Sequence, residues 1–183
     1  MMTKEKIREE IKRKLEGQGE KERLERSRKI QEALFHSEAF QRAKCILIYV
    51  SFNGEVDTRG IIRKCFSMGK RVVVPKVNVE EACVNLREIR DDGSLVKGTY
   101  GIPEPREDRS HEARPEEIDC VILPGVAFDR SGRRLGRGGG FFDKLLSAIP
   151  AKVPRIALAF SFQVVDRLPV NGHDRPVDRV LQA

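Results

Sequence analysis

Tryptophan is absent from this chain, aromatic residues are only 6% of it, and no long hydrophobic run occurs. The longest run, residues 45–50, suits a buried strand and is too short for a bilayer, which takes about 20 apolar residues. The N-terminus is rich in Lys, Arg and Glu, so it lacks the apolar segment of a secretory signal. These absences predict a cytoplasmic protein that does not cross a membrane.

Cysteine and histidine are scarce and lie in no metal-binding spacing. The four cysteines and three histidines are spread along the chain without a C-x-x-C pair, so a structural zinc site is not expected. Cys45, Cys65 and Cys120 fall in or beside apolar runs, which predicts reduced thiols in the core.

Acidic residues are outnumbered by basic ones, 28 to 35, which leaves a net charge of +7. Such a balance suits nucleic acid, an anionic membrane or a small polyanion such as a nucleotide. Acids and bases are interleaved over residues 4–32, which is typical of exposed helix faces and not of a stripe that follows phosphates. We therefore expect neither nucleic acid nor a membrane as partner.

The length of 183 residues suits one domain, spanning residues 1–183. Amphipathic helices are predicted at residues 3–16 and 20–36, packed on an α/β core over residues 44–183. Within the core, one helix is expected to be capped by Asp57 or Thr58 and to stop at Gly69, and another to span residues 140–148. Residues 90–117 are expected to form a long connection with at most short helical turns. Strands are expected at 45–50, 71–75, 84–89 (an edge strand), 119–125, 154–160 and 178–182.

Strands that alternate with helices predict an α/β fold with three αβα layers and a mostly parallel sheet covered on both faces. In such sheets ligands bind beyond the carboxyl ends of the strands. That rule indicates three loops, at residues 51–57, at 124–140 and after Phe160.

The segment 124–146, PGVAFDRSGRRLGRGGGFFDKLL, carries the strongest chemical pattern in the sequence. It leads from a predicted strand into a predicted helix and interleaves glycines with Arg130, Arg133, Arg134 and Arg137. Glycine lets backbone N–H groups approach a ligand closely, and a helix N-terminus and arginines both favour phosphate. The pattern predicts a polyphosphate site, and Asp143 could offer an oxygen to Mg²⁺.

Two common nucleotide motifs do not match this segment. A Walker A loop needs G-x-x-x-x-G-K-[ST], and the dinucleotide fingerprint needs a third glycine where Phe141 stands. A merely flexible linker is disfavoured too, because apolar residues alternate with the polar ones.

The run G-x-A-F-D-x-x-G-x-R-L-G-x-G-G-G-F-F-D, ending at Asp143, resembles the signature of the 5-formyltetrahydrofolate cyclo-ligase family, also called methenyltetrahydrofolate synthetases. Four shorter segments resemble family motifs in the same order: KEKIR (4–8), YVSFNGEVDT (49–58), GIPEP (101–105) and HDRPVD (173–178). The family signature usually ends G-Y-Y-D, so Phe141 and Phe142 depart from it by two hydroxyls.

The resemblance implies an enzyme that uses ATP and Mg²⁺ to convert 5-formyltetrahydrofolate to 5,10-methenyltetrahydrofolate, with release of ADP and phosphate. The formyl oxygen is phosphorylated, N10 attacks the activated carbon, and phosphate leaves. The implied fold is related to the sugar-phosphate isomerase and CoA-transferase group. A monomer is expected, and the positive charge suits folate glutamates.

The resemblance also implies site residues. The catalytic residues would be Arg134 and Arg137, and Mg²⁺ would be held by Asp143 and Asp174, with Asp178 as the alternative to Asp174. Folate would contact Val50, Glu55, Arg137, Gly138, Gly139, Gly140 and Phe141. ATP would contact Lys4, Glu5, Lys6, Ile7, Arg8, Arg134, Leu135, Gly136, Arg137, Gly138, Gly139, Gly140, Phe141 and Phe142.

Without the resemblance, several of these residues have simpler interpretations. Glu55 is then best taken as a solvated loop acid, Lys4 and Arg8 as surface charges, and Asp174 as a turn residue after Asn171 and Gly172. Two other functions also stay open, a metal-free isomerase or acyl-carrier enzyme with a general base near the loop, and an RNA-binding module. The scarcity of aromatics disfavours RNA binding through stacked bases.

Overall fold

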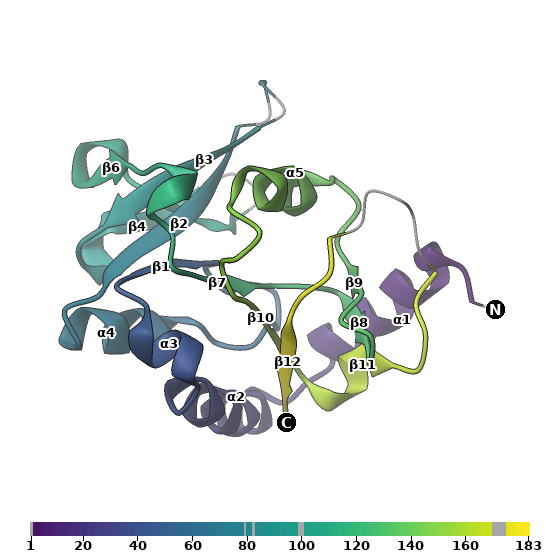
Figure 1. The fold of residues 1–183 in the computed structure, drawn as a ribbon. Coiled ribbons are helices and arrows are strands. Elements are labelled where there is room, and N and C mark those ends of the chain that lie inside the picture. The colour runs from purple at the N-terminus through teal and green to yellow at the C-terminus, as the bar shows by residue number, and fades with distance from the viewer. Residues whose placement is uncertain (1, 79, 82, 99–100, 170–174) are drawn as a thin grey trace.

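The computed structural model describes all residues except 1, 79, 82, 99–100 and 170–174. Its centre is a sheet of seven strands in the order β12-β10-β7-β1-β2-β3-β6 (Figure 1). Five neighbouring strands are parallel, and β3 and β6 add antiparallel at one side. The strands are β1 (Cys45–Ile48), β2 (Arg71–Asn78), β3 (Cys83–Ile89), β6 (Ser110–Glu112), β7 (Cys120–Leu123), β10 (Arg155–Ala159) and β12 (Arg179–Gln182).

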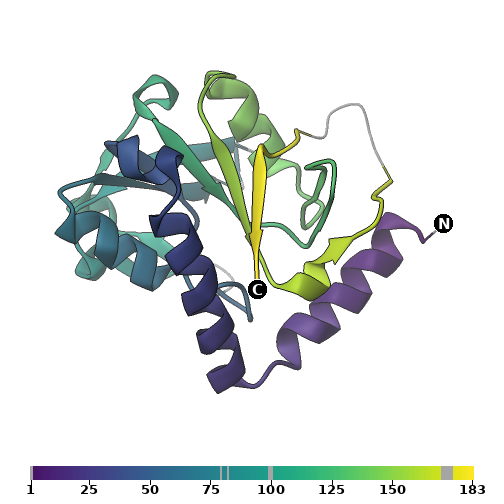
Figure 2. The same ribbon diagram turned by 60° about the horizontal axis from the view of Figure 1, so that its bottom comes forward.

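Helices lie on both faces of this sheet, which confirms the predicted mixed α/β fold with a mostly parallel sheet (Figures 1 and 2). One face packs against α2 (Glu20–Phe35), α3 (Glu38–Arg42) and α4 (Arg59–Ser67), and the other against α5 (Phe141–Ala148). The strands β1 and β7 are buried on both faces, as expected for central parallel strands.

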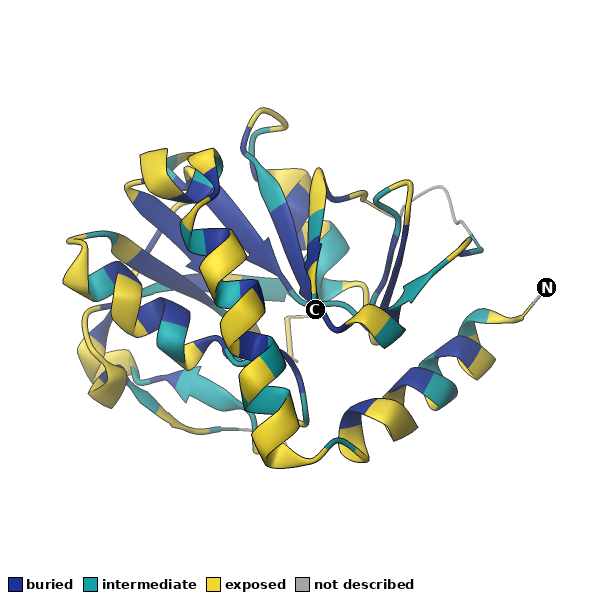
Figure 3. Ribbon diagram, turned by 90° about the horizontal axis from the view of Figure 1, so that it is seen from below, coloured by how far each residue is buried: buried dark blue, intermediate teal, exposed yellow. Residues whose placement is uncertain are grey.

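The first helix, α1 (Lys4–Glu16), begins at an N-cap where Thr3 accepts the N–H of Lys6. Its buried residues Ile7, Ile11 and Leu15 recur at helical spacing and pack into the main core cluster. Figure 3 shows the resulting division of the helices into buried and exposed faces. No helix in the described part of the chain is long and apolar enough to span a membrane.

Short strands interrupt the two segments that are predicted as connections. Within 90–117, β4 (Leu95–Lys97) pairs with β5 (Pro103–Pro105), so the expectation of only short helical turns is wrong. Within 124–140, β8 (Ala127–Asp129) and β9 (Arg134–Leu135) form a hairpin, and β11 (Val164–Val165) pairs with β8. Single-turn 3₁₀ helices are η1 (Asp92–Ser94), η3 (Glu107–Arg109), η4 (Pro115–Glu117) and η5 (Ser161–Gln163).

The prediction that residues 84–89 form an edge strand is wrong. β3 pairs with β2 on one side and with β6 on the other, where Ile89 stands opposite Ser110. β3 is only partly buried, as an edge strand would be, but the three residues of β6 in the following segment pair with its outer side. A pairing partner this short leaves no hydrophobic signal in the sequence.

Candidate functional site

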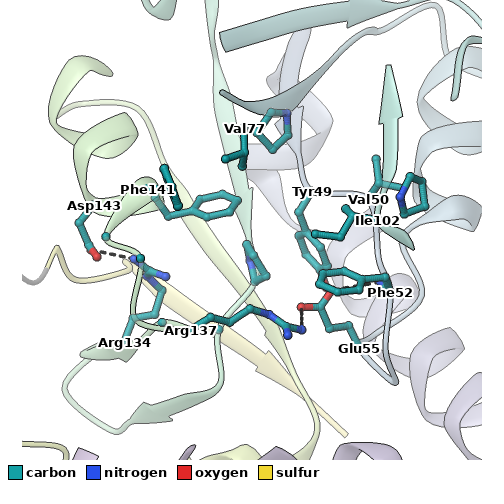
Figure 4. A pocket seen from close by; sticks show the side chains of 18 of the residues that line it. Tyr49, Val50, Phe52, Glu55, Val77, Ile102, Arg134, Arg137, Phe141 and Asp143 are labelled. Carbon is teal, nitrogen blue, oxygen red and sulfur yellow. Dashed lines mark hydrogen bonds and ion pairs between the residues drawn. The ribbon is translucent and has the colours of Figure 1, made fainter. Parts of the chain in front are cut away.

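A cavity of about 410 Å³ opens beyond the carboxyl ends of β1, β2 and β7, where the parallel-sheet rule places ligands (Figure 4). Its walls come from the turn after β1, the far part of β2, the start of β5 and the residue before it, the loop after β7, the segment from residue 134 onward, and the start of α5. They comprise Tyr49, Val50, Phe52, Glu55, Pro75, Val77, Ile102, Pro103, Glu104, Pro124, Gly125, Arg134, Gly136, Arg137, Gly139, Gly140, Phe141, Phe142 and Asp143.

The turn after β1 brings Glu55 into this cavity. Gly54 has a left-handed φ of 78°, and a Cβ there would come within 2.3 Å of the Leu15 carbonyl oxygen, so only glycine fits. The Tyr49 hydroxyl donates to the carbonyl of Val56 at 3.2 Å and ties the end of β1 to the residue after Glu55. Glu55 is only 7% exposed, so its interpretation as a solvated loop acid is wrong.

The Glu55 carboxylate is held at both oxygens. Its Oε1 accepts from Nη2 of Arg137 at 2.8 Å (Figure 4), and its Oε2 accepts from the backbone N–H of Phe52 at 3.2 Å. Burial raises the pKa of Glu55, and the Arg137 charge and both hydrogen bonds oppose that rise. The result is a buried acceptor whose charge is balanced by an arginine from the glycine-rich segment.

That glycine-rich segment leads from the β8–β9 hairpin to α5. The carboxylate of Asp129, buried in the hairpin turn, accepts the N–H groups of Ser131 and Arg133. After β9 the chain reaches Gly140, which has a left-handed φ of 66° and caps the N-terminus of α5. The helix begins at the cavity, and no side chain in the described part of the chain caps it, which leaves first-turn N–H groups that suit a phosphate.

Arg134 and Asp143 are also brought together at the cavity. Arg134 Nη2 donates to Asp143 Oδ1 at 2.7 Å, and the guanidinium lies 5.8 Å from the centre of the Phe142 ring. Arg134 Nε is buried and has no hydrogen-bond partner in the described part of the chain. An arginine that is buried and incompletely bonded is suited to receive a further acceptor from a ligand.

The first helix reaches the same segment from the other side. Arg8 Nε donates to the carbonyl oxygen of Gly136 at 3.0 Å, and a Cβ on Gly138 would lie 3.9 Å from the Arg8 guanidinium carbon. Arg8 also pairs with Glu5 at 3.6 Å. The contact between helix and loop that the ATP prediction requires is therefore present, although the residues are more than 120 positions apart in the chain.

Other residues predicted for the site lie elsewhere. The side chains of Ile7 and Leu135 are buried in the core cluster, so only their backbone could meet a ligand. Of the arginines in the segment, Arg130 is exposed and lies 4.0 Å from Asp166, while Arg133 pairs with Asp129. Lys4 and Lys6 stand on α1 and do not line the cavity.

The predicted metal ligands are only partly described. Asp143 lines the cavity, and its Oδ1 is 3.4 Å from the backbone nitrogen of Arg175; Asp174 itself lies outside the described residues. Asp178, the alternative, accepts the N–H of Arg155 at 2.7 Å and thereby joins the amino ends of β10 and β12. That end of the sheet is opposite to the cavity, which disfavours Asp178 as a metal ligand.

No cluster of three potential metal-ligating side chains occurs among the residues that the structure places. The three buried cysteines offer no nucleophile either, because burial raises the pKa of Cys45 to about 11, and those of Cys65 and Cys120 to about 12. Such thiols stay protonated at neutral pH. All three are free and buried, as predicted for core residues.

Sequence reasoning missed several residues of the cavity wall. The centre of the Phe52 ring lies 4.4 Å from the Arg137 guanidinium carbon, and Ile102, Pro103 and Glu104 also line the cavity. All four fall within segments noted for their resemblance, 49–58 and 101–105, but no role could be given to them because their approach to the loop is tertiary.

Comparisons with known proteins identify relatives that cover most or all of this chain. The model of the 5-formyltetrahydrofolate cyclo-ligase family matches residues 1–183. The 5-formyltetrahydrofolate cyclo-ligase of Mus musculus is 32% identical over 184 residues, covering 96% of this chain and 91% of the mouse protein. That of Escherichia coli strain K12 is 34% identical over 141 residues, covering 76% of this chain and 78% of its own.

Solved structures give the same result. The NMR structure of Aquifex aeolicus 5,10-methenyltetrahydrofolate synthetase matches with a TM-score of 0.86 and 34% identity, over 99% of this chain and 90% of that one. The synthetase of Mycoplasma pneumoniae matches in fold with a TM-score of 0.79 at 24% identity, over 98% of both chains. The chain therefore belongs to the 5-formyltetrahydrofolate cyclo-ligase family, ATP-dependent ligases that convert 5-formyltetrahydrofolate to 5,10-methenyltetrahydrofolate.

Proposed function

We propose that the cavity is where this chain carries out that conversion, with folate beside Glu55 and the phosphates of ATP along residues 134–142. The observation that carries the proposal is the Glu55–Arg137 ion pair. It joins Glu55, which is predicted to accept hydrogen bonds from folate, to Arg137, which is predicted to donate hydrogen bonds to phosphate. The two residues are 82 positions apart in the sequence and line one cavity. Both substrates must meet in one place, because phosphate passes directly from ATP to the formyl oxygen.

The folate side of the proposal is supported by size and by chemistry. A volume of about 410 Å³ lies in the range typical of small-molecule sites. Val77, Ile102 and Phe141 offer apolar surface for aromatic rings, and Glu55 offers carboxylate oxygens to the N–H groups of an aminopyrimidine edge (Figure 4).

The nucleotide side is supported by the donors that converge at the start of α5. Backbone N–H groups at 136–142, the helix N-terminus and Arg134 and Arg137 all favour a polyphosphate. Arg8 braces this segment from α1. We propose that Lys4, Glu5, Lys6 and Ile7, with Arg8, form the far border of the nucleotide site.

The residues present fit Mg²⁺ in the way that nucleotide-dependent enzymes use it. Mg²⁺ is usually bound by one or two carboxylates together with substrate phosphates, and Asp143 is a partly exposed carboxylate at the cavity. We propose Asp143 and Asp174 as its ligands. The ion would neutralise charge on the phosphates.

The residues of the chain would then act by position and charge. Phosphoryl transfer depends on in-line alignment and on neutralisation of the moving charge more than on covalent help. We propose that Arg137 and Arg134 are the catalytic cations, and that Phe141 and Phe142 limit the access of water. No protein nucleophile is needed, in keeping with the protonated thiols.

The test is to mix purified protein with 5-formyltetrahydrofolate, Mg²⁺ and ATP and to follow the near-ultraviolet absorbance of the methenyl product. Product should form only with all three present, and ADP should appear in equal amount. A metal-free isomerase would hydrolyse no ATP, and an RNA-binding module would be stabilised against heat by RNA and not by Mg-ATP. Either result would refute the proposal.

We further propose that residues 1–183 act as one domain, as a monomer in the cytoplasm, without nucleic acid or membrane as partner. The four free cysteines suit a reducing compartment. Large hydrophobic side chains exposed in the described part of the chain are few: Met2, Met68, Val77 and Val96. Sedimentation of the purified protein would test the monomer.

A further inference from the structure

Phe52 contacts both members of the ion pair in the cavity. Its backbone N–H donates to Glu55 Oε2 at 3.2 Å, and its ring centre lies 4.4 Å from the guanidinium carbon of Arg137. Phe52 belongs to the turn after β1, and its ring borders the same cavity on the side of Arg137 from the glycine-rich segment (Figure 4). One residue thus fixes the carboxylate through its backbone and the arginine through its side chain.

The two charges differ in how firmly they are held. The Glu55 side chain is 8% exposed and lies in a tight turn, whereas that of Arg137 is 50% exposed and extends from a glycine-rich segment. A substrate N–H group that binds Glu55 Oε1 shares or replaces the Arg137 bond there. Once that bond weakens, the Phe52 ring is the contact that keeps the guanidinium beside the cavity.

We infer that Phe52 is a positioning residue, which holds Arg137 at the site of phosphoryl transfer while folate occupies Glu55. The inference rests on the proposed function, because it assigns Glu55 to folate and Arg137 to the transferred phosphate. A flexible arginine without this ring would sample many orientations, and a displaced cation neutralises the moving charge less well.

The test is a double-mutant cycle between Phe52→Leu and Arg137→Ala, with Phe52→Tyr as the variant that keeps the ring. Phe52→Leu should lower kcat about three- to thirtyfold, the range of a cation–π contact, and should leave the Kd of 5-formyltetrahydrofolate nearly unchanged. In the Arg137→Ala background the same substitution should change kcat by less than about twofold, because the two effects share one contact. Phe52→Tyr should lower kcat much less than Phe52→Leu does, because it keeps the aromatic ring.

Two results would overturn the inference. Equal losses from Phe52→Leu with and without Arg137 would mean that the ring acts independently of the arginine. A rise in folate Kd that persists without Arg137 would mean that the ring contacts folate directly. Thermal unfolding of each variant separates these outcomes from misfolding.

A second readout does not depend on activity. The side-chain Nε–H resonance of Arg137 should carry a ring-current shift that Phe52→Leu removes and Phe52→Tyr keeps. Loss of this shift with intact turnover would refute the positioning role. A wild-type protein that forms no methenyl product would refute the proposed function, whatever the resonance shows, and the present inference would fall with it.

Discussion

Arg134 and Asp143 form an ion pair, with Nη2 of the arginine 2.7 Å from Oδ1 of the aspartate. The arginine side chain is 3% exposed and the carboxylate 26%, so the arginine is fixed and the aspartate still faces the cavity. Arg134, proposed to bind phosphate, and Asp143, proposed to bind Mg²⁺, are thus in direct contact with each other.

The first prediction concerns the metal. Asp143→Asn keeps an oxygen that can accept from Arg134, so the fold should survive, but the charge that favours Mg²⁺ is lost. We expect kcat/KM to fall about ten- to a hundredfold at limiting Mg²⁺, the factor that roughly 1.5–3 kcal/mol represents. Initial rates over a Mg²⁺ series measure it.

Asp166→Asn is the matched control for this substitution, because Asp166 is 99% exposed and lies by Arg130, outside the cavity. It should leave the Mg²⁺ dependence unchanged. Full activity of Asp143→Asn at limiting Mg²⁺ would remove Asp143 from the metal site.

The second prediction compares two arginines of one segment. Arg137→Ala should weaken nucleotide binding by about 1.5–3 kcal/mol, because a charge-assisted contact to phosphate is lost. Arg130→Ala should have no effect, since Arg130 is 84% exposed and points to Asp166. Calorimetric titration with an ATP analogue measures both affinities. Unchanged nucleotide affinity together with weaker folate binding would assign Arg137 to folate.

The third prediction concerns the folate acceptor. Glu55→Gln removes the negative charge and one acceptor, so the KM for 5-formyltetrahydrofolate should rise while the ATP affinity stays nearly constant. Steady-state kinetics with each substrate varied in turn gives both values. An equal effect on the two substrates would indicate a structural role for Glu55.

The fourth prediction is the pH dependence of stability at the same residue. Burial raises the pKa of Glu55 above its ordinary value of 4.5, so the folded state binds this proton more tightly than the unfolded chain. The stability due to this group is complete below pH 4.5 and is lost as the pH rises through the raised pKa. The unfolding free energy of Glu55→Gln, relative to that of the wild type, should therefore increase as the pH rises through the raised pKa.

Urea unfolding of the two proteins over a pH series measures this difference. A difference in unfolding free energy that is constant with pH would contradict the raised pKa of Glu55.

The fifth prediction concerns the two missing hydroxyls. Phe141 and Phe142 both line the cavity, and Phe142 also packs against both core clusters, with its ring centre 5.8 Å from the Arg134 guanidinium carbon. Phe142→Tyr should change kcat/KM by less than about tenfold, under roughly 1.4 kcal/mol, because arginines and backbone N–H groups already supply donors. Phe141→Ala should lose more, since it removes cavity wall. An inactive wild type that Phe142→Tyr activates would disprove this view.

The order of the main helices and strands could be predicted from the sequence, and so could the end of the sheet at which the cavity opens. Buried runs such as residues 45–48 and 120–123, and the spacing of Ile7, Ile11 and Leu15, reflect local periodicity that each segment carries by itself. The glycines and arginines before α5 predict a phosphate-binding segment, and this signal too lies within one short stretch of sequence. These signals need no knowledge of the partner segments.

Only the tertiary structure decided the environment of individual charges. Glu55 is buried because Gly54 packs on the end of α1, and Arg137 rather than Arg130 meets it because the β8–β9 hairpin turns the two arginines to different sides. The burial and partner of a side chain depend on segments far away in the chain. Composition and spacing therefore identified which residues could do chemistry, and long-range packing selected which of them meet.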